Sequence, residues 1–250
     1  MSSRPHRRRT KDDVVVVHSS DLHIDDDYTA RFYGGDGTRG LALVLEAARL
    51  ISADAVILAG DLFEHNRLGL GLFERTARLL QAAALPVVIL PGNHDPLTTE
   101  SAFIRGRIGE VPNVHVLGLG GGSSASFEAL DLEVWGNPHR DYGDMAPLRS
   151  PRPRAARRLI AVAHGHYEPV PDLSRSPRAS WLLGDEEIEA TGADYVALGH
   201  WNRPVKVGGG AIEAHYCGSP ELARSVNVVR MGESGGVWVE RHSLAGIPAD

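Results

Sequence analysis

The chain has 250 residues, of which 42% are hydrophobic and 23% charged, and its formal net charge is −6 at pH 7. These values are those of an ordinary soluble globular protein, and the acidic balance argues against an overall positive field that would collect nucleic acid. The single cysteine, Cys217, excludes an intrachain disulfide and favours a reducing, cytoplasmic compartment. No apolar segment reaches the length of a membrane span or of a signal-peptide core, so no membrane association is expected.

The first half of the chain predicts alternating strands and helices. Residues 1–13 are polar and basic and are expected to form a disordered tail. Behind this tail, short apolar runs predict buried strands, and amphipathic patterns predict helices. The predicted strands cover residues 14–18, 55–59 and 86–90, and the predicted helices cover 40–51 and 72–84. This β-α-β-α-β order implies parallel strands joined by right-handed crossovers.

The second half of the chain is richer in strands. Its candidate strands cover residues 113–117, 132–136, 159–163, 194–198, 211–216, 226–229 and 236–242, with one helix at about 180–190. The glycine-rich stretch 118–124 predicts a turn, and the Pro/Arg-rich stretch 147–158 predicts a surface loop. No internal repeat or long linker divides the chain. Residues 14–250 are therefore predicted to form one domain of two packed mixed sheets with helices outside.

Polar clusters directly follow five of the predicted strands. In open α/β sheets, ligands bind outside the carboxyl ends of the strands, so these side chains are expected to converge. The clusters contain Asp21 and His23; Asp61; Asn93, His94 and Asp95; His164 and His166; and His200 and Asn202. Imidazole and oxygen ligands suit Mn²⁺, Fe and Zn²⁺. They are too many for one ion, but two ions that share a carboxylate could use them, as in phosphate-ester chemistry.

The order and spacing of these clusters resemble a known family. "DLH", "GDLFE", "GNHD", a lone strand-end "H" and "GHWN" are similar to the motifs of the calcineurin-like metallophosphoesterases. "GDLF", "RP" and "YCGSPE" look most like the branch that contains DNA double-strand-break repair exonucleases. The resemblance implies a four-layer α/β/β/α sandwich of two mixed β-sheets. Only about 30 residues follow "YCGSPE", so the capping region of those nucleases and an ATPase partner are not expected.

The resemblance also implies a role for each matching residue. The matches are Asp21 and His23 to ligands of a first ion, Asp61 to a bridging carboxylate, and Asn93, His164 and His200 to ligands of a second ion. His94 corresponds to the general acid that protonates the leaving oxygen, and Asp95 to the residue that orients the His94 ring. The expected nucleophile is a hydroxide that bridges the ions, since metal coordination lowers the pKa of water to about 7.

One position departs from the family pattern. The last histidine of the pattern would fall at residue 202, where this chain has Asn202. An amide oxygen can ligate a metal, but it is neutral and harder than imidazole, which favours Mn²⁺ or Mg²⁺ over Zn²⁺ or Fe. We therefore expect two divalent ions, with Mn²⁺ favoured. The alternative is that Asn202 marks a binding module that keeps the fold and has lost one ion and most of its activity.

The substrate is predicted from weaker signals. His65 and Asn66 could touch the substrate phosphate, and Arg203 could offer it a bidentate contact, although a helix-start loop and a surface salt bridge are the alternatives. His166 is expected to be a surface or supporting residue rather than a ligand. The leading hypothesis is a metal-dependent phosphodiesterase that acts on a nucleic-acid end, a small nucleotide or another small diester. A phosphomonoesterase is the alternative enzyme.

Overall fold

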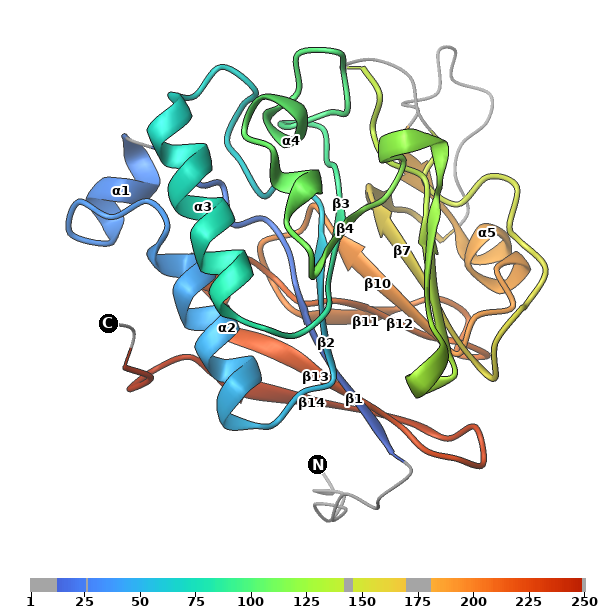
Figure 1. Ribbon diagram of the computed structural model, residues 1–250. Helices are drawn as coiled ribbons and strands as arrows, with labels where there is room; N and C mark the ends of the chain where they lie inside the picture. Colours follow the sequence, from blue (N-terminus) through green and yellow to red (C-terminus); the bar gives the residue numbers. More distant parts are fainter. Residues whose placement is uncertain (1–12, 26, 142–145, 170–180, 249–250) are drawn as a thin grey trace.

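Two mixed sheets lie face to face and carry helices on their outer surfaces (Figure 1). The computed structural model describes residues 13–25, 27–141, 146–169 and 181–248. Within these residues, the first sheet has the strand order β14-β13-β1-β2-β3-β4 and the second has the order β11-β12-β10-β7-β6-β5. The predicted four-layer α/β/β/α sandwich is confirmed. The predicted basic tail lies outside the described residues, apart from Asp13.

The strands of the second sheet form one block of the chain, between β4 and β13 of the first sheet. The first sheet contains β1 (Val14–Ser19), β2 (Ala55–Ala59), β3 (Val87–Leu90), β4 (Val114–Val116), β13 (Ser225–Met231) and β14 (Val237–Ser243). The second contains β5 (Ser124–Phe127), β6 (Leu132–Gly136), β7 (Arg158–His164), β10 (Tyr195–Gly199), β11 (Val205–Val207) and β12 (Glu213–Tyr216). A separate pair consists of β8 (His166–Tyr167) and β9 (Leu182–Leu183).

Helices α2 and α3 cover the first sheet, and α5 lies against the second (Figure 1). The helices are α1 (Tyr28–Phe32), α2 (Arg39–Leu50), α3 (Leu70–Ala82), α4 (Ala102–Arg105), α5 (Asp185–Ala190) and α6 (Pro220–Ala223). No helix among the described residues is both long and apolar enough to cross a membrane.

Three apolar layers hold the sandwich together. Along β1, Val14 and Val16 pack between the sheets, whereas Val17 packs under the helices of the first sheet. Along β10, Tyr195 packs between the sheets and Val196 packs toward α5. Successive side chains of a strand point to opposite faces, so a strand covered on both faces is apolar at every position. This explains why the central strands appear in the sequence as unbroken apolar runs.

The register of the sheets brings five strand ends to one edge. Strands β1, β2 and β3 are parallel neighbours in the first sheet, and β7 and β10 are parallel neighbours in the second. Parallel neighbours end on the same side of a sheet, where the loops that leave them lie next to one another. The five polar clusters of the sequence all leave from this edge.

The structure differs from the sequence prediction mainly in its short elements. The predicted helix at about 180–190 begins only at Asp185, because residues 182–183 form β9 instead. Strands β5 and β11 and helices α1, α4 and α6 were not predicted, since each is only three to five residues long and shows little periodicity. All of the predicted strands are present, with ends that move by at most two residues.

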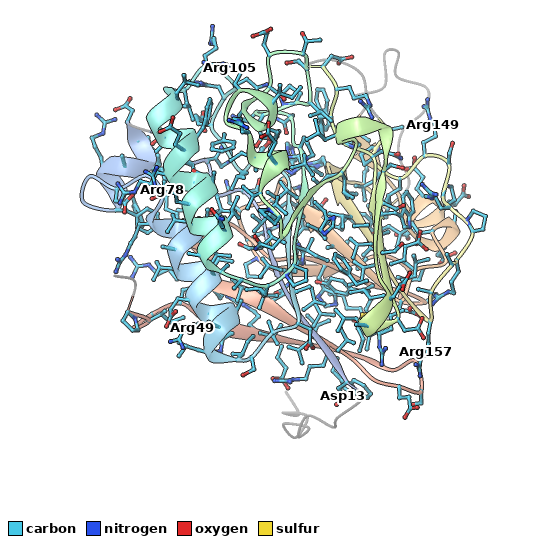
Figure 2. The ribbon with its side chains drawn as sticks, viewed as in Figure 1. Asp13, Arg49, Arg78, Arg105, Arg149 and Arg157 are labelled. Carbon is cyan, nitrogen blue, oxygen red and sulfur yellow. The ribbon has the colours of Figure 1, made fainter. Side chains whose placement is uncertain are left out.

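The Arg-rich stretch runs from the edge where the five strands end, where Asn137 donates to the Arg149 carbonyl at 2.7 Å, to the opposite end of the second sheet. Figure 2 shows Arg149 and Arg157 at the periphery of the molecule. Arg154 pairs with Asp194 at 2.9 Å, and Arg157 pairs with Asp131 at 3.0 Å. Arg158 opens β7, the strand whose other end carries His164, so Arg154, Arg157 and Arg158 lie at the opposite end of the second sheet.

His18 is an imidazole sealed between the two sheets, with its Nδ1 2.8 Å from the Tyr195 hydroxyl. Burial, followed by the charge of His215, lowers the pKa of His18 to about 3. The unfolded chain binds this proton near an ordinary pKa of about 6.5. The stability that depends on neutral His18 is therefore fully present above pH ~6.5 and is lost as the pH falls toward 3.

We expect His18→Asn to flatten the pH dependence of the free energy of unfolding. Between pH ~4 and ~6, the wild-type free energy should fall by up to about 1.4 kcal/mol per pH unit more than that of the variant. Urea unfolding at several pH values measures both slopes. His242→Asn on β14 is the control and should keep the wild-type slope. Equal slopes in His18→Asn and the wild type would contradict the prediction.

Candidate metal centre

The structure gathers candidate ligands, most of them predicted site residues, into two adjoining groups. The first consists of Asp21, Asp61 and His164, and the second of His23, Glu64 and His94. Within each group, the candidate ligand atoms all lie within 4.8 Å of one another. The predicted residues thus come from loops far apart in the chain and meet at the edge where the five strands end.

The loops after β1 and β2 are joined through their backbones. The Asp21 amide donates to the Gly60 carbonyl at 3.0 Å, and the His23 amide donates to the Asp61 carbonyl at 3.1 Å. Asp21, His23 and Asp61 have φ angles of 53°, 45° and 52°. The left-handed region is uncommon for residues other than glycine, and such strain persists only where the surroundings fix it. The backbone bonds between the two loops are part of those surroundings.

Two glycines allow the loops to approach this closely. Gly60 has a φ of 93°, and a Cβ there would lie 2.0 Å from His164 Nδ1. A Cβ on Gly92 would lie 2.1 Å from Asp61 Oδ1. Both distances are far below van der Waals contact, so a larger residue would displace His164 from Gly60 or Asp61 from Gly92.

The Asp61 carboxylate lies at the middle of the centre. Its Oδ1 accepts a hydrogen bond of 2.9 Å from the His94 amide. Its Oδ2 lies 3.1 Å from His164 Nε2 and 3.8 Å from His23 Nε2. One carboxylate oxygen is thus shared between two imidazoles. This is the arrangement that a bridging ligand requires.

The hydrogen bonds of His164 show that its Nε2 is directed at ligand oxygens. Its Nδ1 lies 2.9 Å from the Ala59 carbonyl, which can only accept, so Nδ1 carries the proton. The Nε2 atom then faces Asn93 Oδ1 at 3.0 Å as well as Asp61 Oδ2. A nitrogen lone pair among oxygen lone pairs is unfavourable, so this point holds either a proton on Nε2 or a metal cation. The donor set therefore fits a divalent metal.

The electrostatics favour positive charge at the same point. Burial lowers the pKa of His164, but the Asp61 carboxylate outweighs burial and raises the pKa to about 9. Burial also acts to raise the pKa of Asp61, yet His164 and the neighbouring imidazoles hold it well below its usual range. A buried carboxylate that stays ionised needs a cation beside it.

Glu64 is a functional residue that the sequence analysis missed. Its Oε2 accepts from His23 Nδ1 at 2.7 Å, which leaves His23 Nε2 to face Asp61. Burial lowers the pKa of His23, but the Glu64 hydrogen bond and nearby carboxylates raise it to about 9. The Glu64 carbonyl and Oε1 lie 3.0 and 3.4 Å from His94 Nδ1. Glu64 therefore holds both rings, and its place three residues after Asp61 in "GDLFE" was the available signal.

The prediction that Asp95 orients His94 is wrong. Asp95 is fully buried, and its two oxygens accept from the Gly92 amide at 2.7 Å and the Phe63 amide at 2.9 Å. Adjacent side chains of a turning chain point in different directions, so Asp95 enters the interior while His94 faces outward. The Asp95 carboxylate instead clamps the loop after β3 to the loop after β2.

His200 joins the centre from the second sheet. Its amide donates to Asp21 Oδ1 at 3.1 Å and to Oδ2 at 3.0 Å. Its ring centroid lies 5.3 Å from that of His164. Asn202 is exposed and lines the same cavity as Asp21 and His23. The structure therefore places Asn202 at the side of the centre that the sequence analysis assigned to the first ion.

Two cavities adjoin the centre, and Glu64 and His65 line both. The Tyr28 cavity, of about 430 Å³, also contains Asp21, His23, Asn202 and Tyr28. The His94 cavity, of about 460 Å³, also contains Asn93, His94, His139, Trp181 and His200. His139 was not predicted. It is buried, and its Nε2 lies 3.0 Å from the His164 carbonyl, so it supports the end of β7.

The remaining predicted residues, Asn66, Arg203 and His166, lie in different environments. Asn66 is buried, with its side chain bonded to the Pro96 carbonyl at 2.9 Å and the Ala102 amide at 2.8 Å. It ties the loop to α4 and is not available to a substrate, so this prediction is wrong. Arg203 is exposed and lies over Trp201, with Cζ 5.6 Å from the ring centroid. His166 is exposed and accepts from the Trp201 indole at 2.9 Å.

The sequence matches a family model and curated relatives. The model described as calcineurin-like phosphoesterase matches residues 14–204. The relatives are a subunit of nuclease SbcCD from Escherichia coli strain K12 and its counterpart in Escherichia coli O157:H7. Each is 26% identical to this chain in an alignment 247 residues long that covers 82% of this chain and 60% of the relative. The chain therefore spans about three fifths of the length of these relatives.

Solved structures share the fold at low sequence identity. The crystal structure of TT1561 of Thermus thermophilus has a TM-score of 0.58 and 14% identity, and covers 92% of this chain and 99% of its own. The purple acid phosphatase PPD1 from yellow lupin seeds has a TM-score of 0.58 and 10% identity, and covers 95% of this chain and 52% of its own. At these identities, the likeness supports the fold alone.

We expect Mn²⁺ to stabilise the folded chain through Asp61. At a free Mn²⁺ concentration of about 100 Kd, binding adds about 2.7 kcal/mol, which raises Tm by about 5–10 °C in a chain of this size. Asp61→Asn should lose most of this rise, and Asp131→Asn, at a partly exposed aspartate remote from the centre, should keep it. Thermal unfolding with and without Mn²⁺ measures the shift. A full rise in Asp61→Asn would refute the assignment.

Proposed function

Because this chain belongs to the calcineurin-like phosphoesterase family, we propose that it is a metal-dependent phosphodiesterase with its active centre at Asp61. The observation that carries the proposal is the position of Asp61 Oδ2 between His164 Nε2 and His23 Nε2, beside the outward-facing His94. Cleavage of a diester is supported by the similarity to a protein named as a nuclease. The substrate is a small diester, a nucleotide or a nucleic-acid end.

The ligands divide into two sets that share one carboxylate. The proposed ligands are Asp21, His23 and Asn202 for one ion, Asn93, His164 and His200 for the other, and Asp61 for both. When bound, two divalent cations supply Lewis-acid polarisation of the phosphate and a nucleophilic water at neutral pH. The protein contributes the spacing, because backbone bonds and tightly packed glycines fix the positions of the loops.

His94 is the proposed general acid. Its Nδ1 is held by Glu64, so its Nε2 is the atom left to face the cavity that His94 lines with Asn93 and His200. A general acid must lie within hydrogen-bond reach of the leaving oxygen, and the 38% exposure of His94 permits that approach. Glu64 is the positioning residue, since its carboxylate lies 3.4 Å from the same ring.

We expect the protein to hydrolyse bis-p-nitrophenyl phosphate in the presence of Mn²⁺. The release of p-nitrophenol measures the rate. Asp61→Asn should reduce kcat/KM by about a thousandfold or more, because it removes the shared ligand. His94→Ala should cost about 10²–10⁴-fold on a diester with a poor alkoxide leaving group, and much less on a p-nitrophenyl ester that needs little protonation. Glu64→Gln should also lose more activity on the diester with the poor leaving group than on the p-nitrophenyl ester. Each loss should be smaller than in His94→Ala.

His115→Ala is the matched control for His94→Ala, since His115 is an exposed histidine on β4 that is remote from the centre. It should retain wild-type rates on both diesters. A folded wild-type chain that turns over no phosphodiester with any divalent metal would favour the binding-module alternative. An equal loss on both diesters in His94→Ala would remove its role as the acid.

We propose Mn²⁺ as the preferred metal because Asn202 offers an amide oxygen where an imidazole would favour zinc. Asn202→His should therefore tighten Zn²⁺ binding by about tenfold or more and change Mn²⁺ binding less. Calorimetric titration of the metal-free chain with each ion measures both affinities. Asn202→Ala is the matched control and should weaken the binding of Mn²⁺. Unchanged affinities in both variants would show that residue 202 does not ligate.

A further inference from the structure

His200 has an unusual backbone conformation at the end of β10. Its φ is 106°, in a region that residues other than glycine rarely adopt, and such strain persists only where the surroundings fix it. On one side, the His200 amide is held by both oxygens of Asp21. On the other side, the chain continues into Trp201, whose side chain has partners in the second sheet and in the chain after β7. The anchoring of Trp201 is therefore a second constraint on His200.

The Trp201 indole is held by a stacked ring and by a hydrogen bond. It lies nearly parallel to the buried Tyr216 ring, with the centroids 4.5 Å apart and an interplanar angle of 11°. Its Nε1 donates to His166 Nδ1 at 2.9 Å. The stacking restricts the plane of the indole, and the hydrogen bond restricts its rotation within that plane. We call the side chains of Trp201, Tyr216 and His166 the indole clamp.

The indole clamp joins the chain that follows β7 to the chain that follows β10. The Tyr216 hydroxyl donates to the Gly165 carbonyl at 2.6 Å, and His166 is the next residue along the chain. Strands β7, β10 and β12 lie side by side in the second sheet (Figure 1). The last residue of β7 is His164, and the first residue after β10 is His200. The clamp therefore connects the two segments that carry these imidazoles.

The hydrogen bond also defines the part that His166 plays. An indole N–H can only donate, so His166 Nδ1 is an acceptor and the neutral ring carries its proton on Nε2. While this bond is made, neither ring nitrogen offers a free lone pair to a metal ion. His166 is therefore the acceptor that orients Trp201, and it is not itself a ligand.

We propose that Trp201 is a positioning residue of the metal centre: the indole clamp holds His200 in its strained conformation, at the separation from His164 at which both imidazoles reach one ion. The two ring centroids lie 5.3 Å apart. Residues that orient metal ligands through a second layer of contacts contribute about 10–100-fold to metal affinity. This inference rests on the ligand assignment in the proposed function.

Calorimetric titration of the metal-free protein with Mn²⁺ tests the clamp without turnover. Trp201→Phe keeps a stacked ring but lacks the N–H, and His166→Leu lacks the acceptor, so each should weaken Mn²⁺ binding at one site by about tenfold. His166→Gln offers an amide oxygen as the acceptor and should bind Mn²⁺ nearly as tightly as the wild type. Because both changes remove the same hydrogen bond, the double variant should bind no more weakly than Trp201→Phe alone.

Trp238→Phe is the matched control and should keep the wild-type affinity, since Trp238 lies opposite Arg230, near the start of β1 and away from the centre. His166 is exposed, so its two variants carry the test even where a change at Trp201 lowers stability. Wild-type affinity in both Trp201→Phe and His166→Leu would overturn the proposal, as would equal losses in His166→Gln and His166→Leu. If the expected losses are seen but the wild type hydrolyses no phosphodiester, the proposed activity fails and the clamp stands.

Discussion

The structure depends on keeping one buried carboxylate ionised between imidazoles. Asp61 is 2% exposed, and the desolvation of an anion at such a site costs several kcal/mol unless a cation compensates it. His164 and His23 direct their Nε2 atoms at the same Asp61 oxygen, and each ring is fixed from behind by an acceptor. The neighbouring loops place these imidazoles beside the buried carboxylate. An arrangement that attracts positive charge from two sides is suited to holding a pair of metal ions.

The backbone around the centre stores strain that the sandwich stabilises. Left-handed conformations at residues such as Asp21, His23 and Asp61 cost about 1–3 kcal/mol each. His200, with a φ of 106°, adds a fourth such residue from the second sheet. Fully buried parallel strands end immediately before these residues, so the rigid core bears the strain. The hydrogen bonds that Asp95 accepts from the loops after β2 and β3 also help to hold these strained residues in place.

Sequence patterns predicted the sheets and the position of the centre, because unbroken apolar runs and the polar residues behind them are local signals. They could not predict the direction in which a loop side chain points. Asp95 was expected to orient the His94 ring but is buried away from it, and Glu64, which was quoted only as part of a motif, holds that ring instead. Asn66 failed for the same reason, since its amide bonds to backbone of a distant helix. Such contacts depend on tertiary packing that no local pattern encodes.

The metal centre also lies on the seam between the two halves of the sandwich. His164 reaches back 105 residues to the Ala59 carbonyl, and His200 reaches 179 residues to Asp21. Contacts this distant in the chain form only after long loops have closed, and that closure is entropically slow. A partly folded chain whose two sheets have not docked therefore lacks the assembled ligand set. The full set of candidate ligands depends on the docking of the two sheets.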